Sequence, residues 1–176
     1  MLKLLRIVFP LFLLATPGAA MQEGDSGRSQ YEAGNQAYAA GNWQKARTFL
    51  EESCELGFAE ACSNLGVLHA LGHGVVINQT KAAEYYNRGC AGGSANGCSN
   101  VGWAYENALG LEQDYRRAAQ SYAKACDSGH GLGCRHLGVL YAMGRGVERD
   151  TPRAIEYLQK ALALDPKLDA FELEYP

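Results

Sequence analysis

Six cysteines are the residues of this chain whose type and spacing point most directly to chemistry. They form three pairs, each eight positions apart, and the pairs recur every 36 residues: Cys54 with Cys62, Cys90 with Cys98, and Cys126 with Cys134. Zinc sites usually place cysteines two to four positions apart, and redox sites use C-x-x-C. Neither spacing occurs here. The pattern therefore predicts structural disulfides rather than a metal or redox site.

A second candidate is the segment 121–124, Ser-Tyr-Ala-Lys, which matches the S-x-x-K element of penicillin-recognising enzymes. The chain has no K-T-G or S-D-N partner for it, and its four histidines show no triad spacing. Ser121 also takes the repeat position of Tyr85 and Tyr157, so we expect it to face neighbouring helices. We predict no catalytic residue and no cofactor; an activity, if present, would be β-lactam hydrolysis.

The spacing within each cysteine pair constrains the elements that carry it. On one continuous helix, residues eight apart are separated by ~12 Å. A disulfide requires Cα atoms within about 7 Å. If each pair is bridged, the chain must reverse between its two cysteines. Gly57, Gly93 and Gly129 lie at the same place in the three intervals and suit such a reversal. Each bridge would then join the end of one helix to the start of the next.

The 36-residue period also carries a family resemblance. Residues 65–83 read LGVLHALGHGVVINQTKAA, and residues 137–155 read LGVLYAMGRGVERDTPRAI. These segments resemble the Sel1-like repeat, with its signature L-G-x-x-Y, G-x-G-V and D-x-x-K-A. Three such repeats are expected over residues 58–165. The middle copy departs from the signature at Val101 and Ala108.

A related hairpin is predicted over residues 30–57, because residues 34–46, GNQAYAAGNWQKA, resemble a tetratricopeptide repeat. The resemblance implies an all-α fold, a right-handed α-solenoid of about four antiparallel helix hairpins, which the disulfides would bridge. Asn78, Asp114 and Asp150 recur at the 36-residue step and are predicted to cap the second helix of each Sel1-like repeat.

The ends of the chain are predicted to lie outside the repeats. Residues 1–20 combine two basic residues, an apolar run and a small-residue end, which is the layout of a secretory signal peptide; an uncleaved anchor is the alternative. Residues 21–29 are interpreted as a flexible leader, and residues 166–176 as a C-terminal tail that either caps the last repeat or binds a partner. With the paired cysteines, this predicts a periplasmic or secreted protein with no membrane span after signal removal.

The resemblance to tetratricopeptide proteins implies a concave groove lined by the first helix of each hairpin. We expect steps of three and four residues to place the lining side chains on one helix face. Carried over position by position, they are Asn35, Tyr38, Ser63, Val67, Ala70, Asn96, Ser99, Trp103, Glu106, Arg135, Val139 and Ala142.

The function that these observations favour is binding of a protein or peptide in the groove by an exported, monomeric, non-catalytic scaffold. Net charge is −3, which indicates no nucleic-acid partner. One alternative follows from cysteine-rich secreted Sel1-like relatives, which are linked to penicillin binding and weak β-lactam hydrolysis. Another is an assembly factor of the mitochondrial intermembrane space. The apolar N-terminal run argues against the latter, since transit peptides are amphipathic.

Overall fold

The computed structural model describes the backbone of residues 17–168 and the side chains from residue 27 onward. This range contains helices and loops and no strand. The helices are α1 (Pro17–Ala39), α2 (Trp43–Glu55), α3 (Ala59–Leu71), α4 (Gln79–Ala91), α5 (Ala95–Glu106), α6 (Tyr115–Asp127), α7 (Gly131–Met143) and α8 (Thr151–Leu164).

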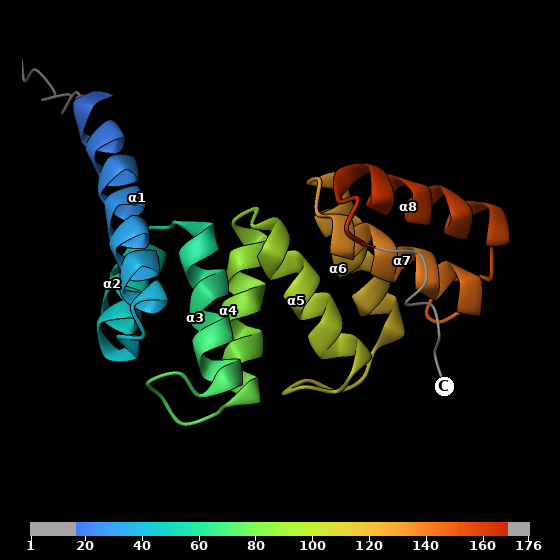
Figure 1. The fold of residues 1–176 in the computed structure, drawn as a ribbon, viewed down its shortest axis with the longest axis horizontal. Helices are drawn as coiled ribbons and strands as arrows, with labels where there is room; N and C mark the ends of the chain where they lie inside the picture. The colour runs from blue at the N-terminus through green and yellow to red at the C-terminus, as the bar shows by residue number, and fades with distance from the viewer. Residues whose placement is uncertain (1–16, 169–176) are drawn as a thin grey trace, which may run out of the picture.

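Consecutive helices pair into four hairpins, α1/α2, α3/α4, α5/α6 and α7/α8, which follow one another along the long axis of the molecule (Figure 1). Each hairpin packs on the next through its second helix. The first helices of successive hairpins also meet, α3 with α5 and α5 with α7. This confirms the predicted all-α solenoid of four hairpins.

Three disulfides connect the hairpins to one another. They join α2 to α3 through Cys54–Cys62, α4 to α5 through Cys90–Cys98, and α6 to α7 through Cys126–Cys134. The bridged Cα atoms are only 4.8, 4.4 and 4.5 Å apart, so the chain does reverse within each interval. The glycine in each reversal has a positive φ of 81° to 95°, a conformation that other residues adopt at a cost.

Side-chain caps start the second helix of every hairpin. The side-chain oxygens of Asn42, Asn78, Asp114 and Asp150 each accept a hydrogen bond from the backbone N–H three residues later. An N-cap of this kind satisfies one of the free N–H groups of a helix start and is worth about 1 kcal/mol. The three caps predicted in the Sel1-like repeats are therefore confirmed.

The loop inside each Sel1-like hairpin contacts the preceding repeat. Gly110 and Gly146 have φ near +70°, and a Cβ atom at either would collide with backbone at the start of the preceding second helix, at Gln79 and Tyr115 respectively. Only glycine permits this approach. The loops thus fix the position of one repeat relative to the next, on the side of the molecule away from the disulfides.

Residues 21–29, which the sequence analysis assigns to a flexible leader, are helical and belong to α1. From Gly27 onward the reason is local packing against the α2–α3 turn. The Gly27 carbonyl oxygen accepts a 2.6 Å hydrogen bond from the buried Ser53 hydroxyl, and the Arg28 guanidinium lies over the Phe58 ring. These contacts lengthen the first helix beyond the tetratricopeptide-like segment.

The other two terminal predictions lie largely outside the described residues. Of the predicted signal peptide, residues 1–16 are not described, and Pro17–Ala20 form the start of α1. Of the predicted tail, residues 169–176 are not described. The last described residue, Leu168, packs against a buried cluster of Cys126, Cys134 and Ala161.

We expect chemical reduction of the three disulfides to destabilise the protein strongly. Each bridge closes a loop of about nine residues, which corresponds to roughly 2.5 kcal/mol of stabilisation by the chain-entropy estimate. For a domain of this size, that is about 5–10 °C of melting temperature per bridge. Circular dichroism melts with and without a strong reductant measure the loss.

The double variant Cys126→Ala/Cys134→Ala, which lacks one bridge, should lose less than full reduction. A variant with all six cysteines replaced serves as control, since reductant should not change its melting temperature. An unchanged melting temperature of the reduced native chain would contradict the prediction.

Candidate functional site

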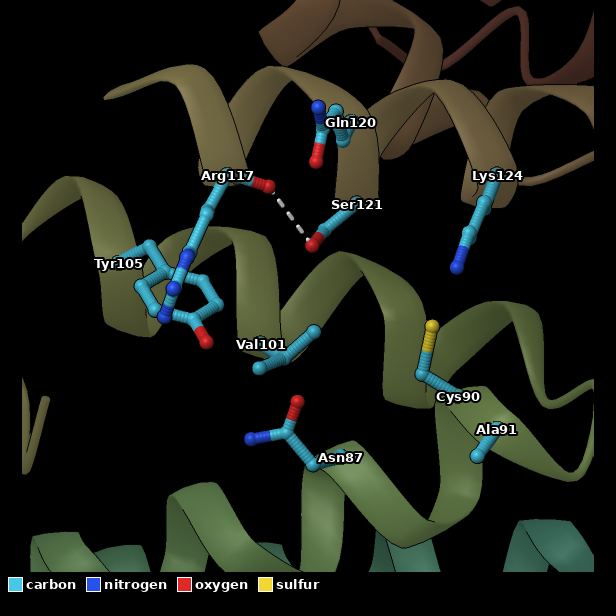
Figure 2. Close-up of a pocket in the computed structure, with 9 residues that line it drawn as sticks. All are labelled: Asn87, Cys90, Ala91, Val101, Tyr105, Arg117, Gln120, Ser121 and Lys124. Carbon is cyan, nitrogen blue, oxygen red and sulfur yellow. Dashed lines mark hydrogen bonds between the residues drawn. The ribbon is translucent and has the colours of Figure 1, made fainter. Parts of the chain in front are cut away.

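A polar pocket of about 270 Å³ lies between α4, α5 and α6. Ser121 and Lys124 project into it from α6, opposite Val101 of α5 and Cys90 of α4 (Figure 2). Arg117, one turn before Ser121, lies at the side of the same pocket over the Tyr105 ring. Because Ser121 and Lys124 are three residues apart, the helix places both on one face. The structure thus brings the serine and lysine of the S-x-x-K element to one pocket.

The contacts of Ser121 differ from those of an activated nucleophile. Its hydroxyl donates a 2.9 Å hydrogen bond to the backbone carbonyl of Arg117, and this is its one hydrogen bond among the described residues. A nucleophilic serine needs a base that accepts its proton. Ser121 also lies in the middle of α6, where backbone N–H groups bond within the helix and cannot form an oxyanion hole.

The twelve residues predicted to line a groove lie on α1, α3, α5 and α7, and they differ in how accessible their side chains are. Eight of the predicted side chains are exposed or half-buried: Asn35, Tyr38, Val67, Ala70, Asn96, Trp103, Arg135 and Ala142. The Asn64 amide donates a 2.8 Å hydrogen bond to Asn35 Oδ1 and so links α3 to α1. The Tyr38 hydroxyl lies 3.3 Å from His73 Nδ1.

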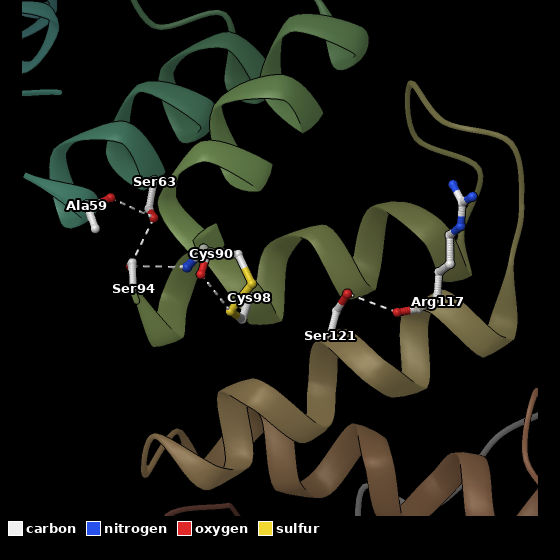
Figure 3. The surroundings of a disulfide bond; sticks show 8 residues. Ala59, Ser63, Cys90, Ser94, Cys98, Arg117 and Ser121 are labelled. Atoms are coloured by element: carbon white, nitrogen blue, oxygen red, sulfur yellow. Dashed lines mark hydrogen bonds between the residues drawn. A yellow bond between two sulfur atoms is a disulfide. The ribbon is translucent and has the colours of Figure 1, made fainter. Parts of the chain in front are cut away.

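Four predicted groove residues are buried, which corrects the prediction for them. Ser63 Oγ lies 3.2 Å from the Ala59 carbonyl oxygen and 2.9 Å from Ser94 Oγ, beside the Cys90–Cys98 bridge (Figure 3). Glu106 is 8% exposed and accepts a 2.8 Å hydrogen bond from the Tyr122 hydroxyl. Ser99 and Val139 are buried as well. Ser63 bonds to the N-cap residue of α5, and Glu106 bonds to the paired helix α6, so neither side chain is available to a groove.

Trp103 is the large side chain that remains available on the predicted face, with 44% of its surface exposed. It borders an apolar pocket of about 240 Å³ between α3, α4 and α5, together with Leu71, Tyr86, Asn100 and Leu109. Leu71 is also more than half exposed. Sequence reasoning missed this pocket because its lining comes from two successive repeats and the loop after α5.

The histidines contribute to packing and capping. His69 is buried and stacks on Tyr85, with ring centroids 5.4 Å apart. His130 caps α7 by accepting a hydrogen bond from the Gly133 N–H, and burial lowers the pKa of His130.

His136 stacks on Tyr122, with ring centroids 4.8 Å apart, and burial, with the nearby Arg135 and His130, lowers the pKa of His136 to about 4. Its imidazole is therefore neutral at physiological pH.

Residues 17–168 contain neither a metal-binding cluster nor a membrane-spanning helix. No group of three or more His, Cys, Asp or Glu side chains there is arranged to hold a metal ion, and all six cysteines are in bridges. None of the helices in this range combines the length and apolarity needed to cross a membrane.

The repeat geometry agrees with a comparison of the sequence with known families. The Sel1 repeat model matches residues 59–94, 95–130 and 131–166, which is more than half of the chain. The chain belongs to the Sel1 repeat family. The three matched Sel1 repeats correspond to the hairpins α3/α4, α5/α6 and α7/α8, each with the turn that follows it.

Three similar Sel1-type proteins illustrate how far the likeness extends. Helicobacter pylori cysteine rich protein B is 31% identical, with a TM-score of 0.58 over 70% of this chain and 89% of that one. The antigen c5321 of uropathogenic Escherichia coli, described as having an SLR fold, is 27% identical, with a TM-score of 0.72 over 82% of this chain and 32% of that one.

The third relative is HcpE of Helicobacter pylori strain J99, whose name describes it as a candidate beta-lactamase. It is 36% identical over 45 residues, which are 26% of this chain and 13% of HcpE. The chain therefore spans about a third of c5321 and a small part of HcpE.

The lowered pKa of His136 predicts that acid destabilises this Sel1 repeat protein. An unfolded histidine has a pKa of about 6.5. Between pH 6.5 and about 4 the unfolded chain binds the proton and the folded chain does not. Stability from this group is therefore complete above pH 6.5 and is lost as pH falls towards 4, by at most about 1.4 kcal/mol per pH unit.

The matched variant is His136→Asn, because asparagine occupies the same repeat position at Asn64 and Asn100. Urea unfolding at pH 7.5, 6, 5 and 4 compares the two proteins. The variant should lose less stability with acid than the native chain, although His69 and His130 still titrate. Parallel pH profiles for the two proteins would contradict the prediction.

Proposed function

We propose that this protein is an exported, non-catalytic scaffold that binds a protein or peptide along the face formed by α1, α3, α5 and α7. The observation that carries the proposal is the exposed indole of Trp103 beside an apolar pocket. Tryptophan is enriched at the energetic centres of protein interfaces, especially next to pockets. Sel1 repeats form protein-interaction scaffolds, so this face fits the family.

Export is the second part of the proposal. The three bridges need an oxidising compartment to form and persist, such as the periplasm or the extracellular space. The cysteine-rich relatives from Helicobacter pylori support the same assignment by family likeness.

The interaction face can be tested by photo-crosslinking in the cell that produces the protein. A photoreactive residue at Asn96, which is exposed on α5, should capture one defined partner, whereas the same residue at Arg116, which is exposed on α6, should not. Trp103→Ala should reduce the yield at position 96 at least tenfold, because truncation of a buried aromatic anchor costs about 2 kcal/mol or more. Equal capture at both positions, or capture that survives Trp103→Ala, would rule out this face.

Penicillin binding is a second candidate function. Two observations favour it: the name of the relative HcpE, and the location of Ser121 and Lys124 in one pocket. The hydrogen bond from Ser121 to the Arg117 carbonyl weighs against acylation.

We expect no covalent label when the purified protein is incubated with a fluorescent penicillin and then denatured. A known penicillin-binding protein serves as the positive control. A label that withstands denaturation and disappears in Ser121→Ala would establish this second function instead.

A further inference from the structure

The internal repeat shows that one aromatic ring is missing from the middle of the array. Tyr85 of α4 stacks on His69 of α3, with ring centroids 5.4 Å apart and ring planes 13° apart. Tyr157 of α8 stacks in the same way on Tyr141 of α7, at 5.6 Å and 13°. The corresponding pair in the middle repeat is Ser121 of α6 and Tyr105 of α5.

The other contacts of the middle tyrosine are the same as in the next repeat. The guanidinium of Arg117 lies 5.7 Å from the Tyr105 ring centroid, and that of Arg153 lies 5.7 Å from the Tyr141 ring centroid. Both arginines also pair with the aspartate that caps their helix, at 3.5 Å. The two repeats therefore differ locally in the ring that stacks on this tyrosine: Tyr157 supplies it in the last repeat, and Ser121 supplies none in the middle repeat. The polar pocket lies where that ring would be.

The size of the pocket is sufficient for a ring. Its volume is about 270 Å³, and its walls include Tyr105 and Val101 on one side and Ser121 on the other (Figure 2). An engineered apolar cavity of about 150 Å³ in another protein is enough to hold benzene. The space opposite Tyr105 can therefore accept one ring with a short substituent.

The positively charged side chains around the pocket favour a ligand whose ring carries an anionic substituent. Lys124 and Arg117 line it, and none of the lining residues is acidic. Arg117 is paired with Asp114, but Lys124 makes no ion pair within the described part of the chain. A carboxylate next to Lys124 would complete a charge-assisted hydrogen bond that the protein itself does not supply.

We propose that this pocket binds a small molecule in which a planar ring is joined to a carboxylate. The ring takes the place of the missing tyrosine against Tyr105, and the carboxylate pairs with Lys124 and, at the rim, with Arg117. Binding is non-covalent and does not use Ser121 as a nucleophile. The pocket shares no lining residue with the pocket beside Trp103, so this site is independent of the proposed protein-binding face.

The ligand class can be tested with three matched probes: 3-phenylpropanoate, its uncharged amide, and propanoate, which lacks the ring. The methyl groups of Val101, at the floor of the pocket, report binding in carbon–proton correlation spectra of the whole protein. We expect a saturable shift with 3-phenylpropanoate, and at least tenfold weaker binding of the amide and of propanoate. Equal affinity for all three probes, or no shift with any of them, would overturn the proposal.

Two variants test the geometry. Ser121→Tyr restores the repeat residue, so it should abolish the Val101 shift and raise the melting temperature by roughly 2–4 °C through the restored stack. Ser128→Tyr makes the same chemical change at an exposed position outside the pocket and should leave binding unchanged. A melting temperature of Ser121→Tyr below that of Ser128→Tyr, or persistent binding in Ser121→Tyr, would show that the vacancy does not hold a ring.

The charge is tested separately. Lys124→Gln should reduce the affinity for 3-phenylpropanoate to that for the amide, while Lys167→Gln, an exposed lysine outside the pocket, should have no effect. An unchanged preference for the acid in Lys124→Gln would overturn the assignment of the carboxylate. These readouts do not depend on the crosslinking or penicillin experiments, so failure of either proposed function leaves this test intact.

Discussion

The reversal of the chain between successive hairpins, closed by a disulfide, is the constraint on which the rest of the structure depends. A single helix hairpin buries too little apolar surface to be stable, so its stability comes from its neighbours. Here each junction is covalent, with bridged Cα atoms no more than 4.8 Å apart. On the opposite side, loop glycines such as Gly110 bring the backbone of one repeat against the next. Together these contacts repeat one geometry every 36 residues, so residues at equivalent positions can be compared directly.

Departures from this geometry concentrate in the middle repeat. Ala108 adopts a positive φ of 55° in the turn after α5, whereas the equivalent residues after α3 and α7 are the left-handed capping glycines Gly72 and Gly144. Ser121 replaces a stacking tyrosine, and the exposed Trp103 lies on the same repeat. The pocket beside Trp103 and the pocket beside Ser121 both border α5, the first through Asn100 and Trp103 and the second through Val101 and Tyr105. Since residues two apart on a helix point in nearly opposite directions, one helix serves two separate surfaces.

Much of the fold was predictable because the signals are local and repeated. The cysteine spacing required a chain reversal, the glycines between the cysteines indicated where it occurs, and the capping residues marked the start of each second helix. The limits of α1 were less accessible to sequence reasoning. Residues 21–29 are polar and contain glycine, which is typical of a leader, but contacts of Gly27 and Arg28 with the α2–α3 turn keep the helix continuous there.

The sequence by itself determined the number of hairpins and the cysteine pairing, because both follow from spacing along the chain, and its motifs carried the resemblance to the Sel1 repeat. Only the tertiary structure decided which members of a helical face are accessible. Ser63 and Glu106 share the predicted face with Asn96 and Trp103, yet they bond to Ser94 and Tyr122 in the interior. It also decided that a serine in place of a tyrosine leaves a pocket rather than a collapsed gap. The physical reason is that burial depends on the neighbouring helices, whose backbones are held at a fixed separation by the bridges and loop contacts, and this separation is not encoded in any single segment.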